Sequence, residues 1–111
     1  METTTIAAIA TPQGYGGIGI VRISGPEAIG IALKVFCPAA YGNAFPAADW
    51  TPVSRYFYHG SILDDKTGQT LDEVLFVVMR APFSYTGEDV VEIHAHGSPE
   101  VLQEILELLL R

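Results

Sequence analysis

The sequence predicts an α+β fold with a mixed or antiparallel sheet of about five strands and two helices, in the order ββαβββα. Three observations lead to this class: short apolar runs of strand type, two segments with helix-start signals, and turn-forming residues between them. The chain has 111 residues, of which 49% are hydrophobic and 17% charged, so it can fold around one core. We expect residues 1–111 to form a single domain.

Five segments have the composition of β-strands. They lie at residues 5–10, 18–23, 54–63, 71–80 and 89–96. The stretch between the third and fourth segments is rich in turn residues and favours an antiparallel hairpin. Three glycine-rich or proline-rich stretches should form a turn and two loops, and they lie at residues 13–17, 38–53 and 81–87.

Two segments carry helix signals. The first contains Ser24 and Glu27 at capping-box spacing, and it should end near Phe36 because a proline follows. The second has Ser98 as a cap and Pro99 at its first position. Its expected buried face consists of Val101, Leu102, Ile105, Leu106 and Leu109. The sequence ends in the middle of this helical pattern without a stop signal, so we expect a fragment of a longer protein.

The composition limits the classes of partner and compartment. Six Lys and Arg against thirteen Asp and Glu give a net charge of −7, which opposes binding to phosphate backbones. Cys37 is the single cysteine, so an intrachain disulfide is impossible, and a buried thiol is favoured over a reactive one. The sequence has no apolar run of membrane-spanning length and no signal peptide. We therefore expect a cytoplasmic protein.

A glycine-rich motif at residues 14–19 matches G-x-G-x-x-G letter for letter. In dinucleotide-binding proteins a helix follows these glycines and faces the pyrophosphate, whereas here a strand follows them. The glycines are better explained by a turn that allows close approach of backbone or ligand. The sequence contains no G-x-x-x-x-G-K-[ST] phosphate loop, so it lacks GTPase machinery of its own.

Charged residues within two apolar strands are the candidate functional residues. Strand alternation places Glu92, His94 and His96 on one face, and Arg22 is a lone charge in its own strand. A buried charge needs a partner, so Arg22 and Glu92 should pair with each other, reach solvent, or contact a ligand. His94 and His96 resemble an H-x-H metal pair, but polar residues on a half-exposed strand are the simpler interpretation.

Three separated motifs resemble the tRNA-modification GTPase family called MnmE or TrmE. They are residues 5–12 (TIAAIATP), 16–25 (GGIGIVRISG) and 85–92 (YTGEDVVE). The residues at 81–82 and 94–97 continue the resemblance, which covers nearly the whole chain apart from the proline-rich loop. Tyr15 stands where a basic residue is expected, and Ala95 and Ser98 stand where glycines are usual. These departures concern loop details.

The resemblance implies properties that spacing does not show. It implies a fold similar to the tetrahydrofolate-binding domain of aminomethyltransferases, a 5-formyl or 5,10-methylene tetrahydrofolate ligand, and a homodimer formed through this domain. The folate-contacting arginine and glutamate of the family fall on Arg22 and Glu92. Further folate contacts, a downstream lysine and the C-terminus of the parent, lie outside this chain. One carboxylate suits the paired N–H donors of a pterin, and an arginine suits a folate oxygen or glutamyl carboxylate.

The resemblance also implies a larger parent protein. A helical domain with an inserted GTPase domain would follow, and GTP, potassium and magnesium would bind only there. With a flavin- and NADH-dependent partner, the parent would modify C5 of the wobble uridine in tRNA. The fragment would then have no complete catalytic site and would not bind tRNA alone. Two alternatives remain: a purely structural dimerisation domain with internally paired charges, and a small metal-binding protein using His94 and His96.

Overall fold

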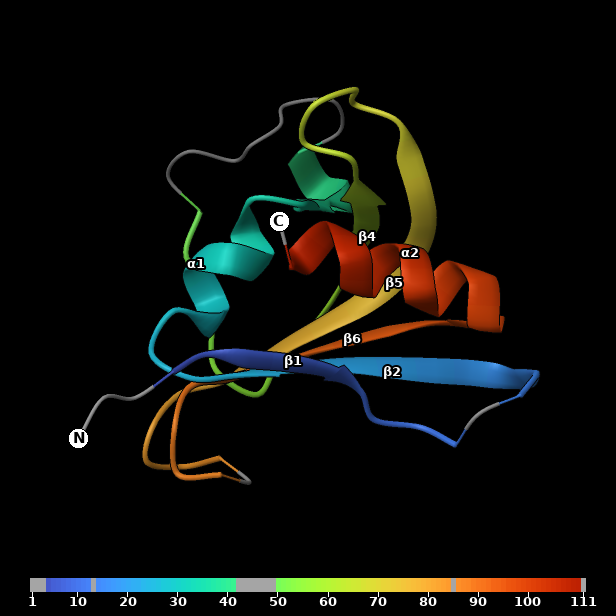
Figure 1. The fold of residues 1–111 in the computed structure, drawn as a ribbon. Coiled ribbons are helices and arrows are strands. Elements are labelled where there is room, and N and C mark those ends of the chain that lie inside the picture. Colours follow the sequence, from blue (N-terminus) through green and yellow to red (C-terminus); the bar gives the residue numbers. More distant parts are fainter. Residues whose placement is uncertain (1–3, 13, 42–49, 85, 111) are drawn as a thin grey trace.

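The computed structural model describes residues 4–12, 14–41, 50–84 and 86–110 of the chain, and these contain six strands and two α-helices (Figure 1). The strands are β1 (Ile6–Ile9), β2 (Gly16–Ser24), β3 (Phe36–Pro38), β4 (Phe57–Leu63), β5 (Thr70–Met79) and β6 (Val90–Gly97). The helices are α1 (Ala28–Leu33), α2 (Pro99–Leu109) and the short 3-10 helix η1 (Ala39–Tyr41).

The strands form one sheet in the order β1-β2-β6-β5-β4-β3, and all neighbouring strands are antiparallel. Both α-helices pack on the same face of this sheet (Figure 1). The predicted α+β class is therefore confirmed, with an antiparallel rather than a mixed sheet. We call the side of the sheet turned away from α1 and α2 the uncovered face.

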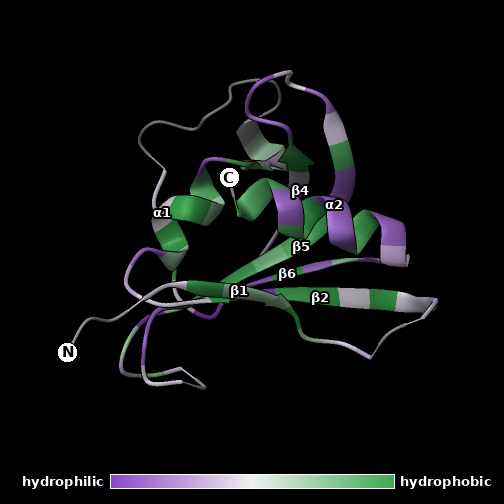
Figure 2. Cartoon of the chain, viewed as in Figure 1, coloured by the Kyte–Doolittle hydropathy of each residue, from purple (hydrophilic) through white to green (hydrophobic). Residues whose placement is uncertain are grey.

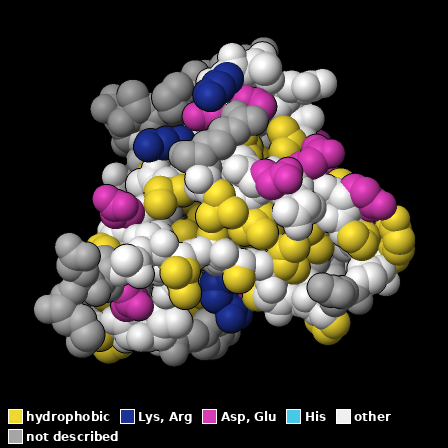
Figure 3. All heavy atoms as spheres, viewed as in Figure 1, with side chains coloured by type: hydrophobic (Ala, Val, Ile, Leu, Met, Phe, Trp, Pro, Cys, Tyr) yellow, Lys and Arg dark blue, Asp and Glu magenta, His cyan; other side chains and the backbone are white. Residues whose placement is uncertain are grey.

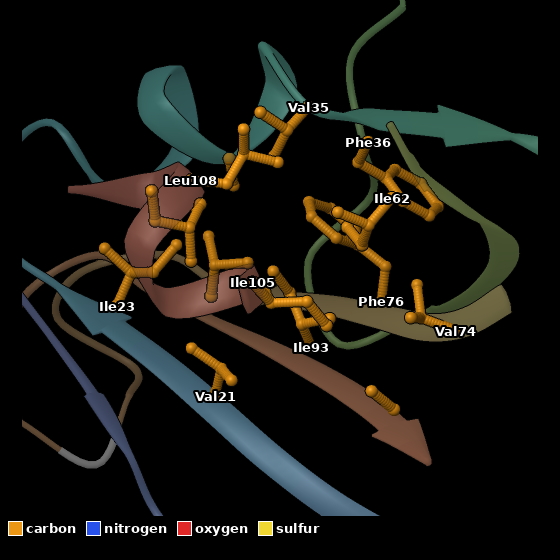
Figure 4. Close-up of a cluster of buried hydrophobic side chains, with 14 of the residues drawn as sticks. Val21, Ile23, Val35, Phe36, Ile62, Val74, Phe76, Ile93, Ile105 and Leu108 are labelled. Carbon is orange, nitrogen blue, oxygen red and sulfur yellow. The ribbon is translucent and has the colours of Figure 1, made fainter. Parts of the chain in front are cut away.

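The hydrophobic core lies between the sheet and the two helices (Figure 4). Its side chains converge from all the main elements, among them Val21, Ile23, Phe36, Ile62, Phe76, Ile93, Ile105 and Leu108. The rings of Phe36 and Phe76 are stacked with centroids 4.1 Å apart. Trp50 packs edge-on against Tyr58 at 4.9 Å, so the end of the predicted surface loop at 38–53 contributes to the core.

Helix α2 confirms the predicted amphipathic pattern. Hydrophobic and hydrophilic residues alternate around it (Figure 2), and its buried residues are Leu102, Ile105, Leu108 and Leu109. Val101 and Leu106 are only partly buried at the edge of the core. Ser98 occupies the N-cap position, but its hydroxyl donates to Glu100 Oε2 at 2.8 Å and does not cap a backbone N–H.

The predicted glycine-rich turn is wrong in its second part because β2 already begins at Gly16. A side chain at Gly19 would overlap the side chain of Leu102, so this glycine lets α2 approach the strand closely. A side chain at Gly97 would likewise overlap the Gly16 carbonyl on the neighbouring strand. The expected close approach of backbone is thus present, within the sheet rather than in a turn.

A sixth strand, β3, lies where the sequence predicted the end of a helix and the start of a loop. Among the described strands it is an edge strand that pairs only with β4, and it aligns Phe36 with Ile62 and Pro38 with Gly60. Proline is tolerated on an edge because one side of the strand needs no backbone donor. Cys37 within β3 is buried, as predicted.

The predicted start of the first helix is wrong. Ser24 is the last residue of β2, and its hydroxyl lies 2.9 Å from the Thr86 hydroxyl. Helix α1 begins only at Ala28, after Gly25 at φ 141°, and no side chain caps it from the N-cap position. The hydroxyl of Thr5 instead accepts a hydrogen bond from the Glu27 N–H at 3.0 Å, so the cap comes from a distant segment.

Other boundaries shift by a few residues. Strand β4 begins at Phe57 rather than at residue 54, after Arg55 at the left-handed φ of 70°. Residue 13, residues 42–49 of the predicted loop, and residue 85 of the third motif lie outside the described residues. Across the described part of the chain, no helix combines the length and apolar character needed to span a membrane.

Candidate functional site

The strongest concentration of polar groups inside the sheet lies on the uncovered face of β2 and β6. Alternation along these strands directs Val21 and Ile93 into the core and turns Arg22 and Glu92 to the other side. The register places Arg22 directly opposite Glu92. The residues of the uncovered face include Ile6, Ile18, Ile20, Arg22, Phe57, Leu75, Val77, Glu92 and His94.

Arg22 and Glu92 form a close ion pair. Glu92 Oε2 accepts hydrogen bonds from Arg22 Nε at 2.9 Å and from Nη2 at 2.6 Å. The Glu92 side chain is only 8% exposed, whereas the Arg22 side chain is 37% exposed. The sequence left pairing and ligand contact as alternatives for these residues, and the structure shows that pairing is present.

His94 completes the environment of the carboxylate. Its Nε2 lies 3.0 Å from Glu92 Oε1, and its ring meets Phe57 edge-on with centroids 5.3 Å apart. Burial raises the pKa of Glu92, but hydrogen bonds from His94 and Arg22 and the charge of Arg22 lower it more strongly. The pKa of Glu92 therefore lies below its ordinary value, and the group is an anion at neutral pH.

The geometry leaves the carboxylate with capacity for a ligand. Two carboxylate oxygens offer about four acceptor positions, and Arg22 and His94 occupy three of them among the described contacts. The fourth position is on Glu92 Oε1, where one further N–H donor would be accepted. A ligand with two adjacent donors can bind both oxygens if Arg22 releases one of its two bonds.

The histidines proposed as a metal pair have separate partners. His94 contacts Glu92, whereas His96 Nδ1 lies 2.7 Å from Asp72 Oδ1 and its backbone N–H donates to Asp72 Oδ2. His59 lies 3.9 Å from Glu73 in an exposed ion pair. Within the described ranges, no three His, Cys, Asp or Glu side chains are placed to hold a metal ion.

The sequence did not predict that the segment between β5 and β6 contacts the end of β2. Figure 1 shows this segment extending from the end of the sheet on the side away from the helices. It is tied to the end of β2 by the Ser24–Thr86 hydroxyl contact and by the Asp89 carbonyl, which accepts from the Gly25 N–H at 2.9 Å. Its own two ends are joined by Asp89 Oδ1, which accepts from the Ala81 N–H at 2.8 Å. Its conformation depends on contacts with distant strands, so local turn composition could not predict it.

The comparison with known proteins agrees with the motifs on β1, β2 and β6. A sequence model of the family described as "GTP-binding protein TrmE N-terminus" matches residues 5–111. The chain belongs to this family. It is similar to the "tRNA modification GTPase MnmE" of Syntrophobacter fumaroxidans, with 53% identity over 96% of the chain. The proteins of the same name from Syntrophus aciditrophicus and Carboxydothermus hydrogenoformans are 51% and 49% identical over the whole chain.

The family match covers only one part of these relatives. The chain spans 21% of the length of the Syntrophobacter protein and 23% of the other two. The matched residues include every strand and both helices described above, and thus β2 and β6, which carry the Arg22–Glu92 pair. The similarity therefore identifies the domain to which the chain corresponds, the N-terminus of the family.

Proposed function

We propose that the chain is the tetrahydrofolate-binding and self-associating N-terminal domain of a tRNA-modification GTPase. Family membership supports the proposal that the chain is a domain of a tRNA-modification GTPase. The observation that carries the ligand proposal is the shielded Glu92 carboxylate, kept ionised on the uncovered face by Arg22 and His94. A carboxylate held in this way is suited to recognise a ligand that presents adjacent N–H donors.

A reduced pterin has this chemistry. Its ring N–H and exocyclic amine point in the same direction, and together they can donate to the two oxygens of Glu92. Binding would replace one of the Arg22 bonds, because Glu92 Oε2 already accepts two. Arg22 is more than a third exposed, so its guanidinium could then turn to a folate oxygen. The proposed ligand is a 5-formyl or 5,10-methylene tetrahydrofolate.

Binding of this ligand is tested by calorimetric titration of the wild type and Glu92→Gln with 5-formyltetrahydrofolate. The amide keeps the shape of the side chain but replaces one acceptor with a donor that faces the pterin. Losing a charge-assisted bond should weaken binding by about ten- to a hundredfold. Glu104→Gln, an exposed residue of α2, is the matched control and should leave the affinity unchanged. Equal affinity in wild type and Glu92→Gln would exclude Glu92 as the folate contact.

Self-association is supported by apolar side chains on the uncovered face. Ile6, Ile18, Phe57 and Leu75 are between 44% and 66% exposed there. Hydrophobic side chains also gather at the surface of the side seen in Figure 3, with acidic side chains around them. Exposed apolar patches of this kind commonly become interfaces, and a symmetric dimer is the commonest closed assembly. Light scattering should give about twice the chain mass of 12.0 kDa, and a monomer at tens of micromolar would contradict the proposal.

The remaining activities would belong to other parts of the parent protein. GTP, potassium and magnesium would bind in its GTPase domain, and a flavin- and NADH-dependent partner would join it in modifying C5 of the wobble uridine in tRNA. We place this assembly in the cytoplasm. The 111-residue chain lacks a phosphate loop and carries a charge of −7. It should therefore show no thermal shift with micromolar GTP and no retention of tRNA in gel-shift assays at physiological salt.

A purely structural role for the ion pair is the second candidate. The pairing of Arg22 with Glu92 favours it, because the two charges satisfy each other without a ligand. In that case Glu92→Gln would lower the melting temperature and leave folate affinity unchanged. The same pair of measurements, titration and thermal melt, therefore separates the two functions.

A further inference from the structure

Two arginines and one aromatic ring line a pair of adjoining hollows at one end of the β4–β5 hairpin. Arg55 and Phe83 border both hollows, which have volumes of about 390 and 460 Å³. Arg80 lines the first hollow, and Met79 lines the second. The chain has only six Lys and Arg in total, so two of them at one hollow are a notable concentration of positive charge.

Hydrogen bonds position the backbone of Arg55 and the side chain of Arg80 beside the hollows. The N–H of Arg55 donates to the Val78 carbonyl at 2.8 Å. The backbone of Arg55 is left-handed, with φ 70°, and its side chain is exposed. The Arg55 guanidinium carbon lies 6.0 Å from the centre of the Phe83 ring. Arg80 Nη2 donates to the Pro52 carbonyl at 3.0 Å. This contact holds the half-buried Arg80 side chain at the first hollow.

The charges at the hollows favour an anionic ligand. A guanidinium carries five N–H donors, and the contacts described for Arg55 and Arg80 use few of them. No Asp or Glu is among the described residues that line either hollow. Guanidinium groups bind carboxylates, like phosphates, with matched, two-point geometry.

The hollows lie at the end of β5, the strand that pairs with β6 beside Glu92. Val77 of β5 is aligned with Glu92, and Met79 follows two residues later on the same face of that strand. The segment after β5 extends on the uncovered side of the sheet (Figure 1). A ligand anchored at Glu92 and extended along β5 would therefore reach Arg55 and Phe83.

We propose that Arg55 and Arg80 bind the glutamyl carboxylates of the folate tail, so that the domain prefers polyglutamylated folates. This inference rests on the folate-binding function proposed above. In a folate, the aminobenzoyl group separates the pterin from the first glutamyl residue and carries the tail away from Glu92. Each added glutamyl residue brings one more carboxylate, which an exposed arginine can pair with at the end of β5.

A nucleic-acid ligand is less consistent with this surface. Affinity for a phosphate backbone grows with the number of cations that neutralise phosphates, and these hollows supply two in a chain of net charge −7. A short tail with a few carboxylates requires no more cations than the two arginines that line the first hollow.

The test compares the mono- and triglutamate forms of 5-formyltetrahydrofolate by titration of the intact protein at low salt. The wild type should bind the triglutamate about three- to tenfold more tightly, since each exposed carboxylate pair contributes about two- to fivefold. Arg55→Gln should lower the affinity for the triglutamate by about two- to fivefold. The preference for the triglutamate over the monoglutamate should fall by the same factor. Lys66→Gln removes the same charge in the hairpin turn at the opposite end of β4 and β5, and should leave the preference intact.

The outcomes separate this inference from the function on which it rests. Failure of the wild type to bind either form would overturn both. Binding of the monoglutamate without a preference for the triglutamate would overturn only the tail site. Equal effects of Arg55→Gln and Lys66→Gln would mean that general charge, and not the hollow, sets the preference. An unchanged preference in Arg55→Gln, together with weaker binding of a short RNA, would assign the hollow to nucleic acid and contradict the proposal.

Discussion

The two faces of the sheet use the same strands for different purposes. On the covered face, Val21 and Ile93 are completely buried beneath α1 and α2. One residue away on the same strands, Arg22 and Glu92 face the other side and form a hydrogen-bonded ion pair. The covered face is held by non-directional packing, whereas the uncovered face is held by directional bonds. Neighbouring residues should therefore respond differently to the same kind of substitution.

The largest expected effect comes from the covered face. Phe76→Ala removes a fully buried ring stacked on Phe36 and should cost about 3–5 kcal/mol of unfolding free energy. Leu75→Ala removes the neighbouring side chain, which is 44% exposed, and should cost less than about 1 kcal/mol. Denaturant unfolding at a concentration where the protein is monomeric measures both. Equal losses would show that the two faces do not differ in packing.

The next largest effect concerns the ion pair. Arg22→Leu leaves the shielded Glu92 carboxylate with His94 as its remaining described partner and should cost about 1–3 kcal/mol. Replacing both residues with leucine removes the unpaired charge as well, so the double variant should recover much of the loss. A thermodynamic cycle from the four unfolding curves gives the coupling. Additive losses would mean that the pair contributes nothing as a pair.

A smaller effect should follow from pH. The folded state lowers the pKa of Glu92, so the unfolded chain binds more protons as pH falls toward the ordinary carboxyl range. The stability from Glu92 is complete above the unfolded pKa, about 4.3, and is lost as pH falls through the lower folded value. Unfolding free energy should therefore fall less steeply below about pH 5 in Glu92→Gln than in the wild type. Parallel curves would contradict the assigned direction.

The smallest effect on stability is expected for the contact between Tyr15 and helix α2. The Tyr15 hydroxyl donates to Glu100 Oε1 at 2.6 Å, which connects this segment to the first turn of α2. Both groups are exposed, so Tyr15→Phe should leave the unfolding free energy essentially unchanged. The bond raises the pKa of Tyr15, and an ultraviolet titration should show a lower phenol pKa in Glu100→Gln.

Local sequence patterns predicted most of the residues of the strands and of α2 that are buried in the core. For the uncovered face they predicted which residues of β2 and β6 lie there, but not which of them contact each other. Alternation correctly separated Arg22 and Glu92 from the core, because period-two burial is a property of the strand itself. It could not give the strand register, which places the two residues opposite each other. Ser24 shows the same limit: its capping signal was outweighed by the β2–β6 ladder and a hydroxyl contact with Thr86.

Features that need several distant segments were not predictable from the sequence. Strand β3 forms because buried Phe36 pairs with β4, although a helix signal precedes it and a proline lies within it. The hollow at Arg55 combines residues near positions 55, 80 and 83, and Arg55 has a left-handed backbone that its residue type does not suggest. Both strand β3 and the hollow at Arg55 depend on contacts between segments that are distant in the sequence.

The most direct measurement of the central claim is a crystal structure of the chain with 5-formyltetrahydrofolate bound. We expect the pterin on the uncovered face, with its ring N–H and amine each about 2.7–3.2 Å from a Glu92 oxygen. Arg22 should then retain only one of its two present bonds to Glu92 Oε2. A folate bound elsewhere, or an unchanged Arg22–Glu92 pair at saturating ligand, would contradict the claim that this ion pair is the folate site.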